Sequence, residues 1–261
     1  MYRCVREIYD RERGSRYFHA IVSFAAEQYG KVDEAEREAL EALRVFPGDV
    51  WAHHALLHAF LLSKQHDKAL QFANVVKEAW VASDRGSLQA DLSVIGMPAS
   101  VTMPTRPLCA FLRTHCVWHL ALVYLHKGDL SSMWSLYYLH LWPHQDKYVY
   151  SGDAAKDVAD AQVILNALGL MIKTALYTGM SQAIRQELTS ILAAVDACRV
   201  DETHADLLLD VLIVVARRLL KHETRTDLAR NFTKSFAGRG GAYYDRLRKG
   251  YLAVICKVTP S

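Results

Sequence analysis

The chain has 261 residues, of which 51% are hydrophobic and 23% are charged, with a formal net charge of +3 at pH 7. This composition is typical of a globular protein with its own core, and it excludes a low-complexity chain. Five cysteines without a Cys-x-x-Cys pair argue against a disulfide framework or a thiolate zinc site, and they indicate free thiols in a reducing compartment.

The chain opens with a charged segment, residues 1–13, that we interpret as a lead-in helix. It lacks the apolar core of a secretory signal, and its arginines leave a mitochondrial transit peptide open. No later apolar run reaches the ~20 residues of a membrane span. We therefore expect an intracellular protein without a membrane span, cytoplasmic by default, with a mitochondrial location as the alternative.

Residues 16–82 contain two copies of one helical-hairpin pattern, thirty-four residues apart. Asp33 corresponds to Asp67, and Ala35 corresponds to Ala69. A period of thirty-four residues is that of the tetratricopeptide repeat. The small Ala35 and Ala69 are expected to be buried where the two helices of each hairpin cross. The four helices that we expect are 17–28, 33–45, 51–62 and 66–82.

Residues 83–107 interrupt the pattern, because prolines and glycines occur there without sustained periodicity. We expect a long loop that packs over a groove or against a partner. The third hairpin follows at 108–142, with its turn at 127–129. Further helices are expected at 181–197, 201–220, 224–236 and 242–257. Residues 153–177 are expected to form either one long helix or two short helices broken near Gly169. The predicted fold is all-α without a sheet: one tetratricopeptide-like, right-handed superhelical domain over residues 1–261.

The last part of the chain, residues 217–261, is basic, with eleven Lys and Arg against three Asp and Glu. We interpret most of this excess as solvated helix faces. An anionic partner at this end is the alternative.

Two pairs of histidines carry the main chemical signal. His54 and His58 are four residues apart, and so are His115 and His119, so each pair lies on one helix face. In the register of the repeats, these positions and Trp118 are expected to face a concave groove.

We weigh three interpretations of these histidines. The favoured one is structural: the imidazoles hydrogen-bond one another, because buried polar groups need partners. The second is contact with a peptide or an anion, and the third is a metal site at the four histidines. Asp160 and His204 are further candidates that could add oxygen and nitrogen ligands.

Two histidine-containing segments also resemble the tetratricopeptide repeat protein 38 family. They are 52–58 (Ala-His-His-Ala-Leu-Leu-His) and 115–122 (His-Cys-Val-Trp-His-Leu-Ala-Leu), the second followed by Gly-Asp at 128–129. Cys116 replaces an asparagine of the family pattern. The resemblance covers roughly residues 16–210, and it implies a shortened, divergent helical-repeat protein without a defined reaction.

No Gly-x-Ser-x-Gly, His-Glu-x-x-His or phosphate-loop motif is present, so no catalytic residues and no cofactor are expected. Helical-repeat stacks expose extended concave surfaces that bind proteins. We therefore predict a protein–protein interaction scaffold, as a non-catalytic subunit of a multi-subunit assembly. The alternative is a metal-binding or small-ligand-binding protein, or an enzyme, that uses the four histidines.

Overall fold

The structure, a computed structural model, describes residues 1–106, 108, 110–142, 161–197 and 207–221. It forms two compact units, Met1–Leu141 and Trp142–Ser261, where the sequence predicts one continuous domain, and each unit is described by itself. Helices dominate the described residues, as predicted. No helix in the described part of the chain has both the length and the apolar character needed to cross a membrane.

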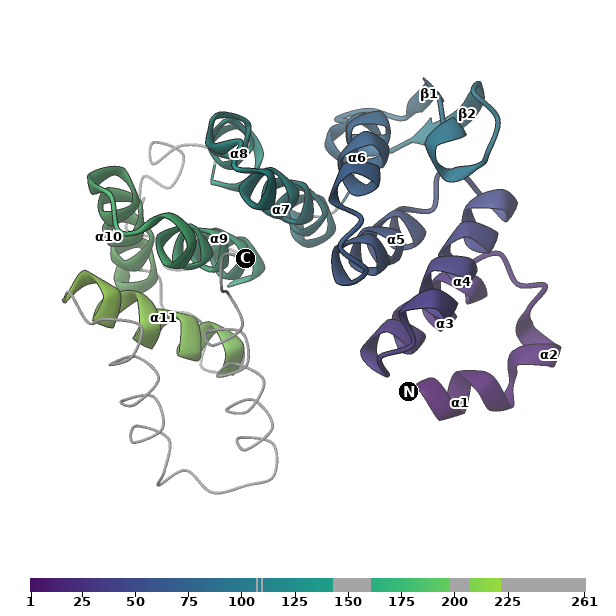
Figure 1. Ribbon diagram of the computed structural model, residues 1–261, viewed down its shortest axis with the longest axis horizontal. Helices are drawn as coiled ribbons and strands as arrows, with labels where there is room; N and C mark the ends of the chain where they lie inside the picture. The colour runs from purple at the N-terminus through teal and green to yellow at the C-terminus, as the bar shows by residue number, and fades with distance from the viewer. Residues whose placement is uncertain (107, 109, 143–160, 198–206, 222–261) are drawn as a thin grey trace. The chain divides into compact units, whose positions relative to one another are not determined.

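Unit 1 consists of successive antiparallel helical hairpins (Figure 1). Helix α6 begins at His66, thirty-four residues after α4 begins at Val32, which matches the predicted repeat. The elements are α1 (Tyr2–Glu7), α2 (Tyr9–Glu12), α3 (Phe18–Gln28), α4 (Val32–Val45), α5 (Val50–Leu62), α6 (His66–Val81), α7 (Ala110–Lys127), α8 (Leu130–Leu136) and a π-helical segment (Tyr137–Leu141).

The three hairpin turns have the same backbone conformation. Each places one residue in the left-handed region: Gly30 (φ 82°), Lys64 (φ 60°) and Gly128 (φ 75°). The next residue then donates its N–H to a carbonyl five residues earlier, which ends the first helix with a Schellman motif. These bonds are Lys31 to Ala26 (2.9 Å), Gln65 to Phe60 (2.8 Å) and Asp129 to Tyr124 (3.0 Å). The turn geometry therefore repeats even where a lysine replaces the glycine.

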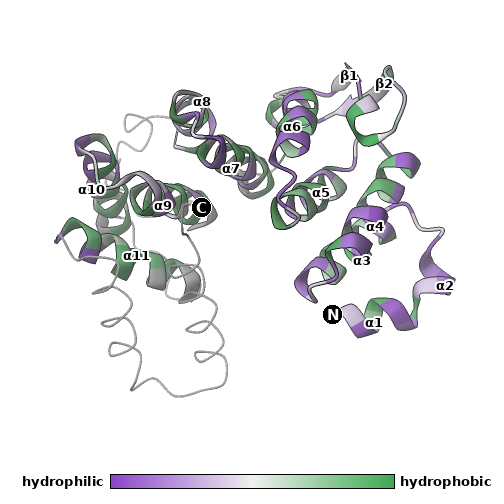
Figure 2. Cartoon of the chain, viewed as in Figure 1, coloured by the Kyte–Doolittle hydropathy of each residue, from purple (hydrophilic) through white to green (hydrophobic). Residues whose placement is uncertain are grey.

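Helix α5 is the central element of unit 1, because it contacts α3, α4, α6 and α7. A helix surrounded in this way is apolar on all sides, and α5 is mostly hydrophobic in Figure 2. Its polar side chains are three histidines, His53, His54 and His58. Asp49 fixes where the helix begins, since its carboxylate accepts the N–H groups of Trp51 and Ala52.

The prediction that no sheet occurs is wrong for the segment after α6. Strands β1 (Gly86–Ala90) and β2 (Val101–Thr105) form an antiparallel hairpin with Leu88 opposite Met103, and a 3-10 turn (Ser93–Ile95) lies between them. The segment packs against α6, and Leu92 and Met103 are fully buried. The strands are short and lie among prolines and glycines, so their alternation of buried and exposed positions does not stand out in the sequence. Packing against the rest of the unit, and not local sequence preference, determines the fold of this segment.

Unit 2 is described over three helices: α9 (Ala161–Thr178), α10 (Gln182–Ala197) and α11 (Leu207–Leu220). Helix α9 contacts both others and continues through Gly169, where the sequence left a break open. Gly179 (φ 87°) directly follows the end of α9 and lies in the left-handed region. The helices expected at 224–236 and 242–257, and the basic part of the chain beyond Lys221, lie outside the described residues.

Ala35 and Ala69 are both fully buried, as predicted for the helix crossings. Ala35 lies in a cluster with Ala26 and Ala59, and its carbonyl accepts the hydroxyl of Ser23 (2.7 Å). The backbones of α3, α4 and α5 therefore approach one another closely at this point.

Replacing Ala35 with leucine should lower the free energy of unfolding by ~1–3 kcal/mol, because the added carbons overpack the crossing. Chemical denaturation with circular dichroism measures this change. The matched control is Arg37→Leu on the exposed side of the same helix, since arginine and leucine have similar helix propensities. Equal midpoints for Ala35→Leu and wild type would show that the crossing is not tightly packed.

Candidate metal centre

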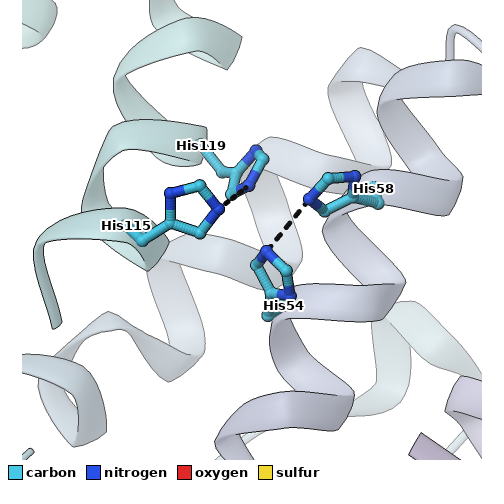
Figure 3. Close-up of side chains that lie close together, drawn as sticks. All are labelled: His54, His58, His115 and His119. Atoms are coloured by element: carbon cyan, nitrogen blue, oxygen red, sulfur yellow. Dashed lines mark hydrogen bonds between the residues drawn. The ribbon is translucent and has the colours of Figure 1, made fainter. Parts of the chain in front are cut away.

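Two neighbouring helices of unit 1 bring four imidazoles together. Helix α5 carries His54 and His58 one turn apart, α7 carries His115 and His119 one turn apart, and the two helices are in contact. We name these four residues the histidine cluster; Figure 3 shows the rings facing a common centre. The β-hairpin insertion separates the two pairs along the chain.

The rings of the histidine cluster are close enough to share one ligand. The Nε2 atoms of His54 and His58 are 3.0 Å apart, and those of His115 and His119 are 3.3 Å apart. Between the helices, the ring centroids of His58 and His119 are 4.3 Å apart. One nitrogen from each ring can be chosen so that all four lie within 4.8 Å of one another.

Burial keeps one member of the histidine cluster, His54, uncharged. His54 and His119 are buried, whereas His58 and His115 are half-buried. Desolvation by burial, together with repulsion from His58 and His115, lowers the pKa of His54 to about 2. His54 is therefore neutral at physiological pH, which is the state in which imidazole binds metals. Its Nδ1 atom is buried without a hydrogen-bond partner.

The adjacent His53 provides a contrast, because both of its ring nitrogens are used structurally. Its Nε2 donates to the carbonyl of Pro47 (2.7 Å), and its Nδ1 accepts the indole N–H of Trp80 (3.2 Å). Burial lowers the pKa of His53 to about 4, although the bond to Pro47 opposes this shift. His53 thus ties α5 to α6 and to the preceding turn, and it has no lone pair left for a ligand.

Residues that sequence reasoning did not select surround the histidine cluster. Phe24 and Trp51 contact the ring of His54, with centroid distances of 6.0 and 5.7 Å. Glu27, near the end of α3, places Oε1 3.4 Å from Nδ1 of His58. Burial alone would raise the pKa of Glu27, but the interactions with His58 and the hydrogen bond from Gln28 together outweigh it, so the net shift of this pKa is downward.

Trp118, the aromatic candidate of the sequence analysis, lies directly beside the cluster. Its ring stacks on His115 at 5.5 Å between centroids and 12° between planes, and it meets His119 edge-on at 4.9 Å. Asp160 and His204, the other two candidates, lie outside the described residues. One feature of the sequence could have drawn attention to Glu27. The equivalent position of the next repeat, thirty-four residues later, is the apolar Leu61, so a charged residue at position 27 is not required by the repeat.

The geometry of the histidine cluster fits a tetrahedral metal ion. A site with metal–nitrogen bonds of about 2.0–2.1 Å has nitrogen–nitrogen edges of about 3.3–3.4 Å. The two Nε2 separations within the helices, 3.0 and 3.3 Å, are close to these edges. Small side-chain movements would bring the remaining pairs, which lie within 4.8 Å, to the same distance.

An apolar hollow of about 320 Å³ is lined by residues from the start and the body of α3 and by one residue of α5. Its lining residues are Tyr17, Ala20, Ile21, Phe24 and Trp51. Ile21 is 51% exposed and Trp51 is 47% exposed. Phe24 and Trp51 line this hollow and also contact the ring of His54, so the two features share these side chains.

Comparison with known proteins places no further constraint on the site, because no family model and no solved structure matches this chain.

The metal-free protein should lose stability as the pH falls from about 6.5 towards about 4. The pKa values of His53 (about 4) and His54 (about 2) in the fold lie below the ordinary value of 6.5. The unfolded chain therefore binds protons in this range that the folded chain does not, and stability is greatest above pH 6.5. The free energy of unfolding should fall by up to about 1.4 kcal/mol per pH unit for each histidine.

Denaturant titrations at several pH values measure this slope. His54→Gln removes one of the two groups, so its slope should be smaller than that of the wild type. An unchanged slope in this variant would contradict the assignment of His54 as a buried neutral imidazole.

Proposed function

We propose that the protein binds one divalent transition-metal ion, with zinc as the first choice, through the histidine cluster of a helical-repeat unit. The observation that carries this proposal is the convergence of four imidazoles, with Nε2 separations of 3.0 and 3.3 Å. Hydrogen bonds among the rings can satisfy the same nitrogens in the metal-free state. Measured metal binding therefore distinguishes a metal site from a set of histidines that only bond one another.

The ligand type selects the class of ion. Imidazole nitrogens suit zinc, copper, nickel and iron, whereas magnesium and calcium prefer oxygen ligands. A site of four neutral nitrogens in a largely buried setting also favours an ion that accepts tetrahedral geometry, as zinc does.

The number of ligands favours a structural role over a catalytic one. Catalytic zinc sites use three protein ligands and leave a fourth position open, whereas four protein ligands close the shell. An ion held by all four histidines would join α5 to α7 across the inserted β-hairpin. It would therefore stabilise the stacking of the second hairpin on the third.

We further propose that the repeats are of the tetratricopeptide type and that the chain is a divergent relative of the tetratricopeptide repeat protein 38 family. The thirty-four-residue spacing of α4 and α6, and the shared left-handed turns at Gly30, Lys64 and Gly128, support the repeat type. The histidine-containing segments 52–58 and 115–122 support the family, as they do in the sequence alone.

Purified full-length protein should bind one zinc ion per chain after its metals have been removed and zinc has been returned. The double variant His54→Gln/His115→Gln should lose this binding. Elemental analysis and calorimetric titration measure the stoichiometry. Zinc at one hundred times its dissociation constant should raise the free energy of unfolding of the wild type by about 2.7 kcal/mol, and it should not stabilise the variant.

A matched control is the double variant His66→Gln/His126→Gln. These two rings stack on each other 5.0 Å apart, outside the histidine cluster, so the variant removes the same number of imidazoles. It should keep the zinc site. Absence of zinc binding by the wild type, or equal binding by a folded His54→Gln/His115→Gln variant, would disprove the metal proposal.

A second candidate function is that of a protein-interaction scaffold, within a larger assembly. The apolar hollow supports it, because Tyr17, Ile21 and Trp51 expose large hydrophobic surfaces together. Grouped apolar exposure of this kind is typical of sites that bind an apolar side chain of a partner.

If this scaffold function holds, Ile21→Asp should abolish binding of a partner protein that the wild type retains, because a carboxylate would be desolvated in the hollow. Affinity capture followed by mass spectrometry and a binding titration measures the loss. Leu62→Asp is the control, since Leu62 is 52% exposed and lies outside the lining of the hollow. Equal loss in both variants would rule out the hollow as the docking site.

A further inference from the structure

We propose that Glu27 is the positioning residue of the histidine cluster, where it orients His58 and fixes which of its nitrogens faces the ion. The inference rests on the proposed metal-binding function. Glu27 belongs to α3, whereas the four histidines belong to α5 and α7. The centre would therefore involve all three hairpins of unit 1.

The charge contact between Glu27 and His58 favours one tautomer. Oε1 of Glu27 is 3.4 Å from Nδ1 of His58, and a negatively charged carboxylate attracts an N–H group and repels a lone pair. A neutral His58 is therefore more stable with its proton on Nδ1. Its Nε2 keeps the lone pair, and this is the atom that points at His54 across 3.0 Å. Carboxylates that hold the far nitrogen of a metal-binding histidine have this same arrangement.

The position of Glu27 is unfavourable by local rules. It is the last residue but one of α3, where the helix dipole disfavours a negative charge, and its side chain is only 9% exposed. Besides His58, its contact in the structure is the amide of the adjacent Gln28, which donates to Oε2 (2.8 Å). A carboxylate kept at a helix end against both dipole and burial indicates a compensating role.

Glu27 also supplies charge that the site needs. Four neutral imidazoles leave the two positive charges of a divalent ion uncompensated, and a buried net charge is unfavourable without a partner of opposite sign. Among the described residues, Glu27 places a carboxylate against the cluster, through the ring of His58. Orientation and charge are thus two separable contributions of one side chain.

Three variants of the full chain separate these contributions. Glu27→Ala removes both the acceptor and the charge, and Glu27→Gln removes the charge but keeps a carbonyl oxygen as acceptor. Glu41→Ala is the control, because it removes a negative charge that pairs with Arg44 at the surface. We expect zinc affinity, measured by competition with a chromophoric chelator, to fall about 10–100-fold in Glu27→Ala. The loss should be smaller in Glu27→Gln and absent in Glu41→Ala.

Nitrogen-15 NMR of the histidine side chains in the metal-free protein gives a readout that a loss of stability does not change. His58 should carry its proton on Nδ1 in the wild type and become a mixture of tautomers in Glu27→Ala. Equal affinity losses in Glu27→Ala and Glu27→Gln, with an unchanged tautomer, would overturn the positioning role. If Glu27→Ala bound zinc as tightly as the wild type, the positioning role would also be overturned, but the proposed four-histidine site would remain. A wild type that binds no zinc would overturn both proposals.

Discussion

The burial of most of α5 among four other helices is the constraint on which unit 1 depends. This helix lies against α3, α4, α6 and α7, so each buried side chain along it must suit an apolar environment or find a partner. Its three histidines meet this requirement in two ways. His53 uses both nitrogens to bind neighbouring structure, whereas His54 and His58 face two further imidazoles from α7. The same burial that holds the fold together therefore creates the candidate site.

The site and the packing of the hairpins are consequently linked. An ion at the histidine cluster would join helices that belong to different hairpins, and Glu27 would bring in a third hairpin through His58. Because the binding free energy of a metal adds to the stability of the state that binds it, occupancy would tighten the stacking of α3, α5 and α7. The apolar hollow shares Phe24 and Trp51 with the surroundings of His54, so its shape would respond to the same packing.

Electrostatics sets the conditions under which such a centre can work. The low pKa of His54 removes competition between protons and metal at neutral pH. Its Nε2 faces His58, and its other ring nitrogen, Nδ1, is buried without a hydrogen-bond partner. A buried unpaired polar atom is costly, and native structures contain few of them. In the helical frame around it, the equivalent turns at Gly30, Lys64 and Gly128 have every expected backbone bond.

The sequence alone determined the helical repeats and the pairing of the histidines, because both depend on short-range periodicity. A thirty-four-residue period gave the hairpins and the buried Ala35, and a spacing of four put each histidine pair on one helix face. Only the tertiary structure showed the β-hairpin after α6, since its strands are short and packing against α6 defines them. Only the tertiary structure brought Glu27 to His58 as well. The repeat distinguishes Glu27 from the apolar Leu61 at the equivalent position. It does not identify the partner of this carboxylate, which depends on how the helices pack in three dimensions.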